Sequence, residues 1–330
     1  MRSDRQQRAD HLKHRLKRLF QVIRMKARGR NLLVIKYLLA FLPIAWILLR
    51  IDFRKFGHAL ATTESWVIPV MALLAILLMF LQGFKWWVLL RAFIPHLSLP
   101  EVLSCHFKGI YFSMFLPTSA AQDIVRTVLL SRNNDFGIAW GATWLARISG
   151  LVVMLMLSLW GVVSIDAASA PPGMRSVVLV SAGCVILMTA MSFSKRLTRR
   201  FRNAFANIFP AKVISAVEHI RDGVYHYRNK RACLLMVILI TVVTQVLFVA
   251  NAIFIMRGIT GRFYIAECFM YIPLIEIICL SLPLTPNGMG VREALSALMF
   301  HQIGLPAEQL GTYVLLGLSA LLLKSVGGVI

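Results

Sequence analysis

Long apolar runs are the feature that most constrains how this chain can fold. A bilayer core about 30 Å thick is crossed by about 20 apolar residues in an α-helix, and a spanning segment must pair all its backbone polar groups internally. We therefore predict an all-α, polytopic membrane helix bundle. Six runs are long and continuous enough to be full spans: 31–50, 66–92, 138–164, 176–193, 232–255 and 308–330.

The composition excludes a soluble protein for most of the chain. Hydrophobic residues make up 58% of the 330 positions and charged residues only 15%, and the mean hydropathy is +0.72. Soluble domains usually keep about 25% charged residues. The few charges in this chain must therefore be accounted for individually.

Positive charge is concentrated in two short segments. Residues 1–30 contain 11 Lys and Arg residues and residues 194–231 contain 10, out of 36 in a chain of net charge +22. Basic segments beside membrane spans stay on the cytoplasmic side and attract anionic lipid headgroups, which we favour over a nucleic-acid partner. We predict a multi-pass protein of a bacterial inner or plasma membrane with a cytoplasmic amino terminus.

These observations divide the chain into four segments. A basic cytoplasmic segment, 1–30, lacks the cleavage site of a signal peptide and is followed by a first membrane half, 31–193. A basic cytoplasmic linker, 194–231, leads to a second membrane half, 232–330. The linker returns to the cytoplasm if the apolar stretch 101–131 enters and leaves the membrane by the same face.

That stretch, 101–131, and a second one, 264–303, are interrupted by proline, glycine and polar residues. Both contain the frame Leu-Pro-x-[Ser/Thr]-x5-Val-Arg, at 116–126 and 282–292. Proline breaks a helix because it lacks the backbone donor and clashes with the preceding turn, so each copy predicts a break followed by a new helix. We expect two re-entrant broken-helix hairpins related as an inverted repeat. With the six spans they make eight membrane segments.

The residues after each proline predict where the new helices begin. Ser119 is expected to be the first N-cap, with Gln122 completing a capping box, and Thr285 the second. Arg126 and Arg292 then lie seven residues past their caps. Helix N-termini and arginines favour anions such as phosphate, so broken helices in corresponding halves indicate a transport site. The alternative is a proline-kinked helix pair whose arginines extend to the interface.

Several other ionisable residues lie inside apolar segments, where charge is costly and usually functional. Arg147 is expected to pair with Asp123 or Glu276, either at a functional site or in a structural ion pair. Glu276 has a second interpretation as a proton-coupling carboxylate. Glu293 adjoins Arg292 and is placed to orient it.

The remaining residues do not indicate an enzyme. The sequence contains no evident nucleophile–base pair, no metal-ligand spacing and no dinucleotide fingerprint, so we predict no catalytic residue, metal or cofactor. The five cysteines are scattered and are expected to be small buried hydrophobes. The pair Trp86-Trp87, with Lys85 and Arg91, is expected to be an anchor at the membrane interface.

Three segments together carry the pattern of a known family. They are Phe115-Leu116-Pro117-Thr118-Ser119 with Asp123 and Arg126, then Trp144-Leu145-Ala146-Arg147-Ile148-Ser149-Gly150, and Leu282-Pro283-Leu284-Thr285-Pro286-Asn287-Gly288-Met289-Gly290-Val291-Arg292-Glu293. They resemble the transmembrane region of lysylphosphatidylglycerol synthases, the flippase-like membrane domain of multiple peptide resistance factor. The resemblance runs from about residue 30 to the end. It departs from the family pattern where Ala121 and Gln122 replace a glycine pair and Ser113 replaces an asparagine.

The resemblance implies that the protein translocates or binds an anionic phospholipid or lipid-linked headgroup. The soluble aminoacyl-transfer domain of the synthases is not expected here, because the chain ends in apolar sequence. The alternative is a non-catalytic membrane subunit that supports a separately encoded lipid-modifying enzyme, such as one of aminoacyl-phosphatidylglycerol or glycolipid synthesis. The expected substrate-binding residues are Thr118, Ser119, Asp123, Arg126, Arg147, Glu276, Thr285, Asn287, Gly288, Gly290, Arg292 and Glu293.

Overall fold

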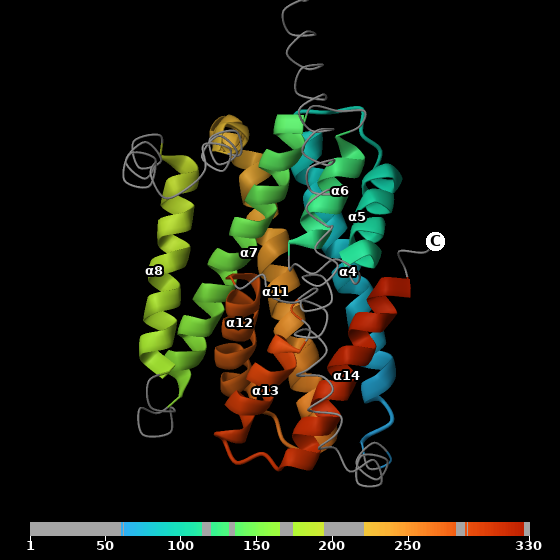
Figure 1. The fold of residues 1–330 in the computed structure, drawn as a ribbon, viewed down its shortest axis with the longest axis vertical. Coiled ribbons are helices and arrows are strands. Elements are labelled where there is room, and N and C mark those ends of the chain that lie inside the picture. The colour runs from blue at the N-terminus through green and yellow to red at the C-terminus, as the bar shows by residue number, and fades with distance from the viewer. Residues whose placement is uncertain are drawn as a thin grey trace, which may run out of the picture.

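The part of the chain that the computed structural model describes is helical throughout its regular elements (Figure 1). The described residues are 61, 63–113, 120–131, 136–165, 174–194, 221–281, 288 and 290–326. In chain order the helices are α4 (Val67–Arg91), α5 (Leu99–Ser113), α6 (Ala121–Leu130), α7 (Phe136–Ser164), α8 (Met174–Phe193), η1 (His226–Asn229), α11 (Arg231–Thr260), α12 (Ile265–Ser281), α13 (Val291–His301) and α14 (Ala307–Val326). The segment 1–30, the predicted span 31–50 and most of the linker 194–231 lie outside the described residues.

Four of the described helices are long and apolar enough to cross a membrane. They are α4, α7 over Gly137–Ser164, α8 over Ser176–Phe193, and α11. Their positions match the predicted runs 66–92, 138–164, 176–193 and 232–255, so the prediction of an all-α membrane protein is confirmed. The last predicted run, 308–330, is represented by the 20-residue helix α14.

Each interrupted stretch forms two helices separated by a break. In the first stretch α5 ends at Ser113 and α6 begins at Ala121, and in the second α12 ends at Ser281 and α13 begins at Val291. The two helices of each stretch pack against each other. The breaks fall on the two proline frames, where a helix loses a backbone donor.

The predicted N-caps of the new helices are wrong, because each helix begins later than the proline frame suggests. Ala120, and not Ser119, is the N-cap of α6, and it makes no side-chain hydrogen bond. Gly290, and not Thr285, is the N-cap of α13. Gly290 has a φ of 81°, which residues with a side chain rarely adopt, and its N–H donates to Glu293 Oε2 at 2.5 Å.

These later starts change where the two arginines of the repeated frame lie. Arg292 is in the first turn of α13, whereas Arg126 is in the second turn of α6. The first turn of a helix presents backbone N–H groups without intrahelical partners. Arg292 therefore lies beside such donors, while Arg126 projects from the side of its helix.

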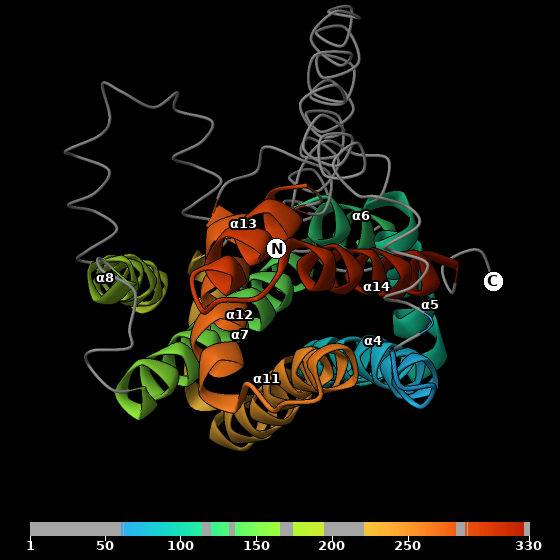
Figure 2. The ribbon, with the colours of Figure 1, turned by 90° about the horizontal axis from the view of Figure 1, so that it is seen from below.

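Close contacts at glycines hold the long helices together. The helices α4 and α11 run antiparallel and side by side (Figures 1 and 2). A Cβ added to Gly258 would lie 1.9 Å from Val67 Cγ2. The helix α7 packs on α12, where a Cβ on Gly161 would lie 2.4 Å from the backbone nitrogen of Met270 and Ser158 Oγ donates to the Met270 carbonyl at 3.1 Å.

The interior of the bundle contains four apolar clusters as well as charged side chains. One apolar cluster joins α11, α12 and α13 around Phe300, and another joins α4, α7 and η1 around Trp86. The helix α8 packs mainly on α7 and stands at the edge of the bundle (Figure 2). Several charged side chains are buried as well, and inside a membrane bundle such groups need partners.

Candidate functional site

The buried charges surround a cavity of about 300 Å³ inside the bundle. Residues of α4, α7, α11 and α14 and of both broken stretches contribute to its wall. The predicted site residues that line it are Asp123, Arg126, Arg147, Glu276, Gly288, Arg292 and Glu293. Gly290 is not among the lining residues and caps the adjoining helix instead. Thr118, Ser119, Thr285 and Asn287 lie outside the described residues.

Asp123, in the first turn of α6, joins two arginines. Its Oδ1 lies 2.8 Å from Arg126 Nη2, and its Oδ2 lies 2.5 Å from Arg147 Nη1. Arg147 Nη2 also donates to the carbonyl of Leu280 at 3.3 Å, at the end of α12. Of the two partners expected for Arg147, the structure therefore selects Asp123, and Glu276 is not one of its ion-pair partners.

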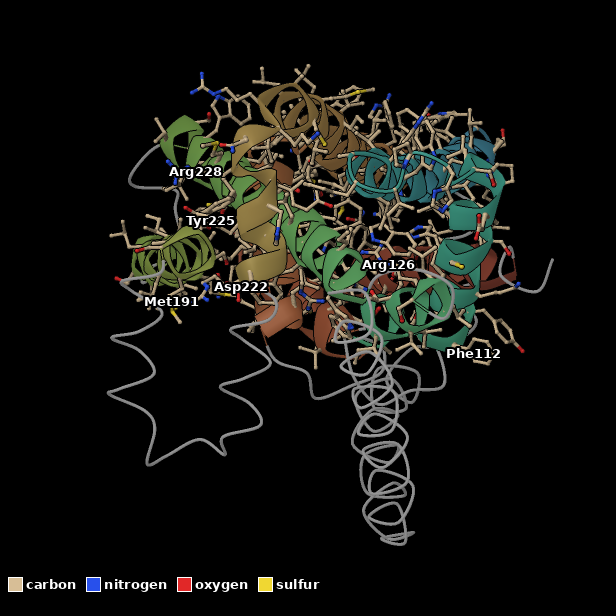
Figure 3. All side chains as sticks on the ribbon, turned by 90° about the horizontal axis from the view of Figure 1, so that it is seen from above. Phe112, Arg126, Met191, Asp222, Tyr225 and Arg228 are labelled. Carbon is tan, nitrogen blue, oxygen red and sulfur yellow. The ribbon has the colours of Figure 1, made fainter. Side chains whose placement is uncertain are left out.

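Arg126 is held by side chains of the first half of the chain. Its guanidinium is 3.1 Å from His106 Nδ1, and its Cζ lies 4.7 Å from the centre of the Trp86 ring. Trp86 Nε1 donates to Thr143 Oγ1 at 3.0 Å, which fixes the ring. Arg126 is only 6% exposed, and Figure 3 shows it within the ring of helices, away from the rim.

Arg292 has a different partner. Its Nε and Nη2 both donate to the carboxylate of Glu276, the second at 3.1 Å, which gives a two-pronged pair. Bidentate arginine–carboxylate pairs are among the strongest polar contacts in proteins. Glu293 was expected to orient Arg292, but its carboxylate accepts the Gly290 N–H, so the orienting group is Glu276.

Two residues that were expected at the membrane interface belong to the interior. Trp86 is fully buried beneath Arg126, and Lys85 is 6% exposed and lines the cavity. Lys85 Nζ donates to the carbonyl of Ala146 at 3.1 Å. Only Trp87 and Arg91 keep the expected place at the end of α4, with Arg91 Cζ 4.8 Å from the centre of the Trp87 ring.

The site role of Lys85 was therefore missed by sequence reasoning, although a signal was present. Lys85 lies inside the apolar run 66–92, whereas Arg91 is at its end. A charge within a span is a functional candidate, and this holds for Lys85 as it does for Arg147. Four cations and three carboxylates line the described part of the cavity, and their net charge is +1.

The described residues contain no group of three or more His, Cys, Asp and Glu side chains that could hold a metal ion. The polar wall of the cavity consists instead of ion pairs and amides, including Gln82, Gln122, Gln245 and Asn251. Such a wall offers charge-assisted hydrogen bonds to a polar group. It is enclosed by helices whose outer faces are apolar.

Helices that can cross a bilayer, closed around a charged cavity, define a polytopic integral membrane protein. The chain belongs to the family described as the lysylphosphatidylglycerol synthase TM region, whose model matches residues 33–322. The match includes every described residue of the cavity wall and indicates a function related to membrane lipid. No curated protein and no solved structure matches the chain significantly.

Proposed function

We propose that this protein is a flippase-like lipid translocase, which admits the anionic headgroup of a phospholipid or lipid-linked molecule into the cavity and releases it at the other face. The observation that carries the proposal is the charged cavity within an apolar helical bundle. Buried ion pairs in a membrane are costly, and they are retained where a polar substrate has to pass. Their net positive charge suits an anionic group.

We also infer that the two membrane halves form an inverted repeat. Arg292 follows Arg126 by 166 positions. The same offset relates α4 to α11, α5 to α12, α6 to α13 and α7 to α14. The ends of the paired helices agree within a few residues. The packing corresponds too: α7 contacts α11 and α12, and α14 contacts α4 and α5. The antiparallel arrangement of α4 and α11 supports the inversion.

The walls of the cavity support the same register. Eight pairs of lining residues are related by this offset of 166: Gln82 and Phe248, Lys85 and Asn251, Ile110 and Glu276, Gln122 and Gly288, Arg126 and Arg292, Arg147 and Tyr313, Leu151 and Gly317, and Met154 and Ala320. Each half thus faces the cavity with equivalent positions. Rocking of one half against the other would then open the cavity to each side in turn.

For the orientation we propose that the end of the bundle near η1 is cytoplasmic. Tyr227, in η1, donates its hydroxyl to the carbonyl of Leu89 at 3.0 Å, so the end of α4 and the start of α11 lie at the same end of the bundle. That end carries the basic residues Arg91, Arg228 and Arg231. Basic residues beside membrane spans favour the cytoplasmic side.

The experiment is a headgroup-accessibility assay. The purified protein is reconstituted into vesicles of phosphatidylethanolamine and phosphatidylglycerol that contain fluorescently labelled phosphatidylglycerol. A reductant that cannot cross the bilayer then bleaches only the label in the outer leaflet. We expect the protein to expose label from the inner leaflet. Protection equal to that in protein-free vesicles would contradict translocation and favour the supporting-subunit alternative.

A further inference from the structure

The charges of the cavity are divided unequally between the two halves of the chain. The first half contributes three cations, Lys85, Arg126 and Arg147, and one carboxylate, Asp123, for a local charge of +2. The second half contributes one arginine and two carboxylates, for a local charge of −1. An anion inside the cavity is therefore attracted to the first half and repelled by the second.

Within the first half, Lys85 is the cation with the least compensation. The two arginines each form an ion pair with Asp123. Among the described residues, no carboxylate lies within ion-pair distance of Lys85, whose ammonium group is held by the carbonyl of Ala146 alone. A buried ammonium without a counter-charge is costly, so its retention points to a counter-ion that comes with a ligand.

The neighbours of Lys85 complete an anion subsite. Its acceptor, Ala146, directly precedes Arg147, so the two cations are held at the same turn of α7. The Arg147 side chain is 15% exposed and also lines the cavity. Gln82 lies three residues before Lys85, on the same face of α4, and adds an amide donor to this wall.

We propose that Lys85, Arg147 and Gln82 form a phosphate-binding subsite on the first-half wall, and that the phosphate does not lie midway between Arg126 and Arg292. This assignment rests on the proposed function: the subsite takes the phosphate of a phospholipid headgroup. Arg126 acts as a positioning residue, because its two terminal nitrogens contact His106 and Asp123 and its guanidinium lies over the Trp86 ring. Arg292 is neutralised by Glu276.

The test compares Lys85→Gln with Lys108→Gln, since Lys108 is an exposed lysine on α5 and its substitution removes the same charge outside the cavity. Short-chain phosphatidylglycerol is titrated into each full-length variant in detergent by calorimetry, and the melting temperature is measured in parallel. We expect Lys85→Gln to bind about tenfold more weakly or worse, as for loss of one charge-assisted hydrogen bond. Lys108→Gln should bind as the wild type does.

The melting temperature separates a binding role from a structural one. Glutamine can still donate to the Ala146 carbonyl and brings no buried charge, so Lys85→Gln should melt at or above the wild-type temperature. Lys85→Arg should retain most of the binding. Equal binding by wild type and Lys85→Gln would overturn the subsite, as would a lost affinity that is accompanied by a lower melting temperature in both Lys85 variants.

Two further arms separate the subsite from the transport proposal. If labelled phosphatidylglycerol moves equally well in wild-type and Lys85→Gln vesicles, the subsite is wrong and translocation stands. If the short-chain lipid binds through Lys85 but no label moves, translocation is wrong and the subsite stands. Inorganic phosphate is titrated as well. Binding as tight as that of the lipid supports the phosphate subsite and makes a soluble phosphate the ligand.

Discussion

At the scale of single residues, the two arginines of the repeated frame differ in what their loss would leave behind. Arg126 shares Asp123 with Arg147, so another guanidinium remains beside that carboxylate if Arg126 is removed. Arg292 is the ion-pair partner of Glu276, whose side chain is only 9% exposed. Removing Arg292 therefore leaves a nearly enclosed carboxylate without its cation.

We expect Arg292→Ala to lower stability by about 3–5 kcal/mol, the usual cost of breaking a buried ion pair from one side. The combined substitution Arg292→Gln with Glu276→Gln removes both charges and should recover most of that loss. Thermal unfolding of the detergent-solubilised protein measures both variants. A double variant as unstable as the single one would contradict this account of the pair.

A matched control is available at the other end of the bundle. Arg221 pairs with Asp222 at 2.6 Å, but Asp222 is exposed. Exposed ion pairs contribute about 0–1 kcal/mol, so Arg221→Ala should change the melting temperature little. A large effect of Arg221→Ala would show that loss of any arginine perturbs the protein.

At the scale of elements, the approach of α6 to α5 depends on a glycine. A Cβ added to Gly109 would lie 2.9 Å from the carbonyl oxygen of Gln122 and 3.1 Å from Arg126 Cβ. Both groups belong to the face of α6 that carries Asp123 and Arg126. The space at Gly109 therefore controls how far the ion-pair cluster extends into the cavity.

We expect Gly109→Ala to lower stability by about 1–3 kcal/mol, because overpacking pushes α6 away from α5. Gly183→Ala is the control: among the described residues no atom lies within 4 Å of an added Cβ at Gly183 in α8, and alanine is the better helix former. Gly183→Ala should therefore be neutral or slightly stabilising. Melting temperatures that fall equally for both variants would argue against the packing explanation.

The described elements were largely predictable from sequence, whereas their caps were not. The run 66–92 became α4, Val67–Arg91, because a long apolar segment has few alternatives to a helix in a bilayer. The second frame predicted an N-cap at Thr285, five residues before the N-cap at Gly290. Gly288 and Gly290, with φ of 74° and 81°, extend the break. A glycine in the sequence permits a positive φ, but the contacts of the folded chain decide whether the glycine adopts it.

At the scale of the whole molecule, translocation requires that the cavity remain open enough for a headgroup. Gly317, in α14, lines the cavity, and an added Cβ there would meet no atom of the described residues within 4 Å. A larger side chain at this position therefore extends into the cavity. This makes Gly317 a place to obstruct the cavity while the fold is preserved.

We expect Gly317→Trp to reduce movement of labelled phosphatidylglycerol to the level of protein-free vesicles, with little change in melting temperature. Gly183→Trp places the same bulk on the outer part of the bundle, where an added Cβ also meets no atom of the part of the chain that the structure describes within 4 Å. It should transport at the wild-type rate. Transport by Gly317→Trp at that same rate would mean that the headgroup does not pass through this cavity.

Sequence alone was enough to predict a helical membrane protein, the positions of its four described spans and the two segments that are broken. These features follow from local physics, because a bilayer offers the backbone no hydrogen-bond partners and proline removes a donor wherever it stands. They therefore need no knowledge of neighbouring helices. The charged residues inside the apolar segments could be identified in the same way.

Which charges meet depends on how the helices pack in three dimensions. Asp123 pairs with Arg147, 24 positions away, and Glu276 with Arg292, while Lys85 turns from an expected interface anchor into part of the cavity wall. The physical reason is that an ion pair depends on how two helices approach and rotate against each other. That geometry is set by packing contacts such as those of Gly109 and α6, which no local pattern in the sequence specifies.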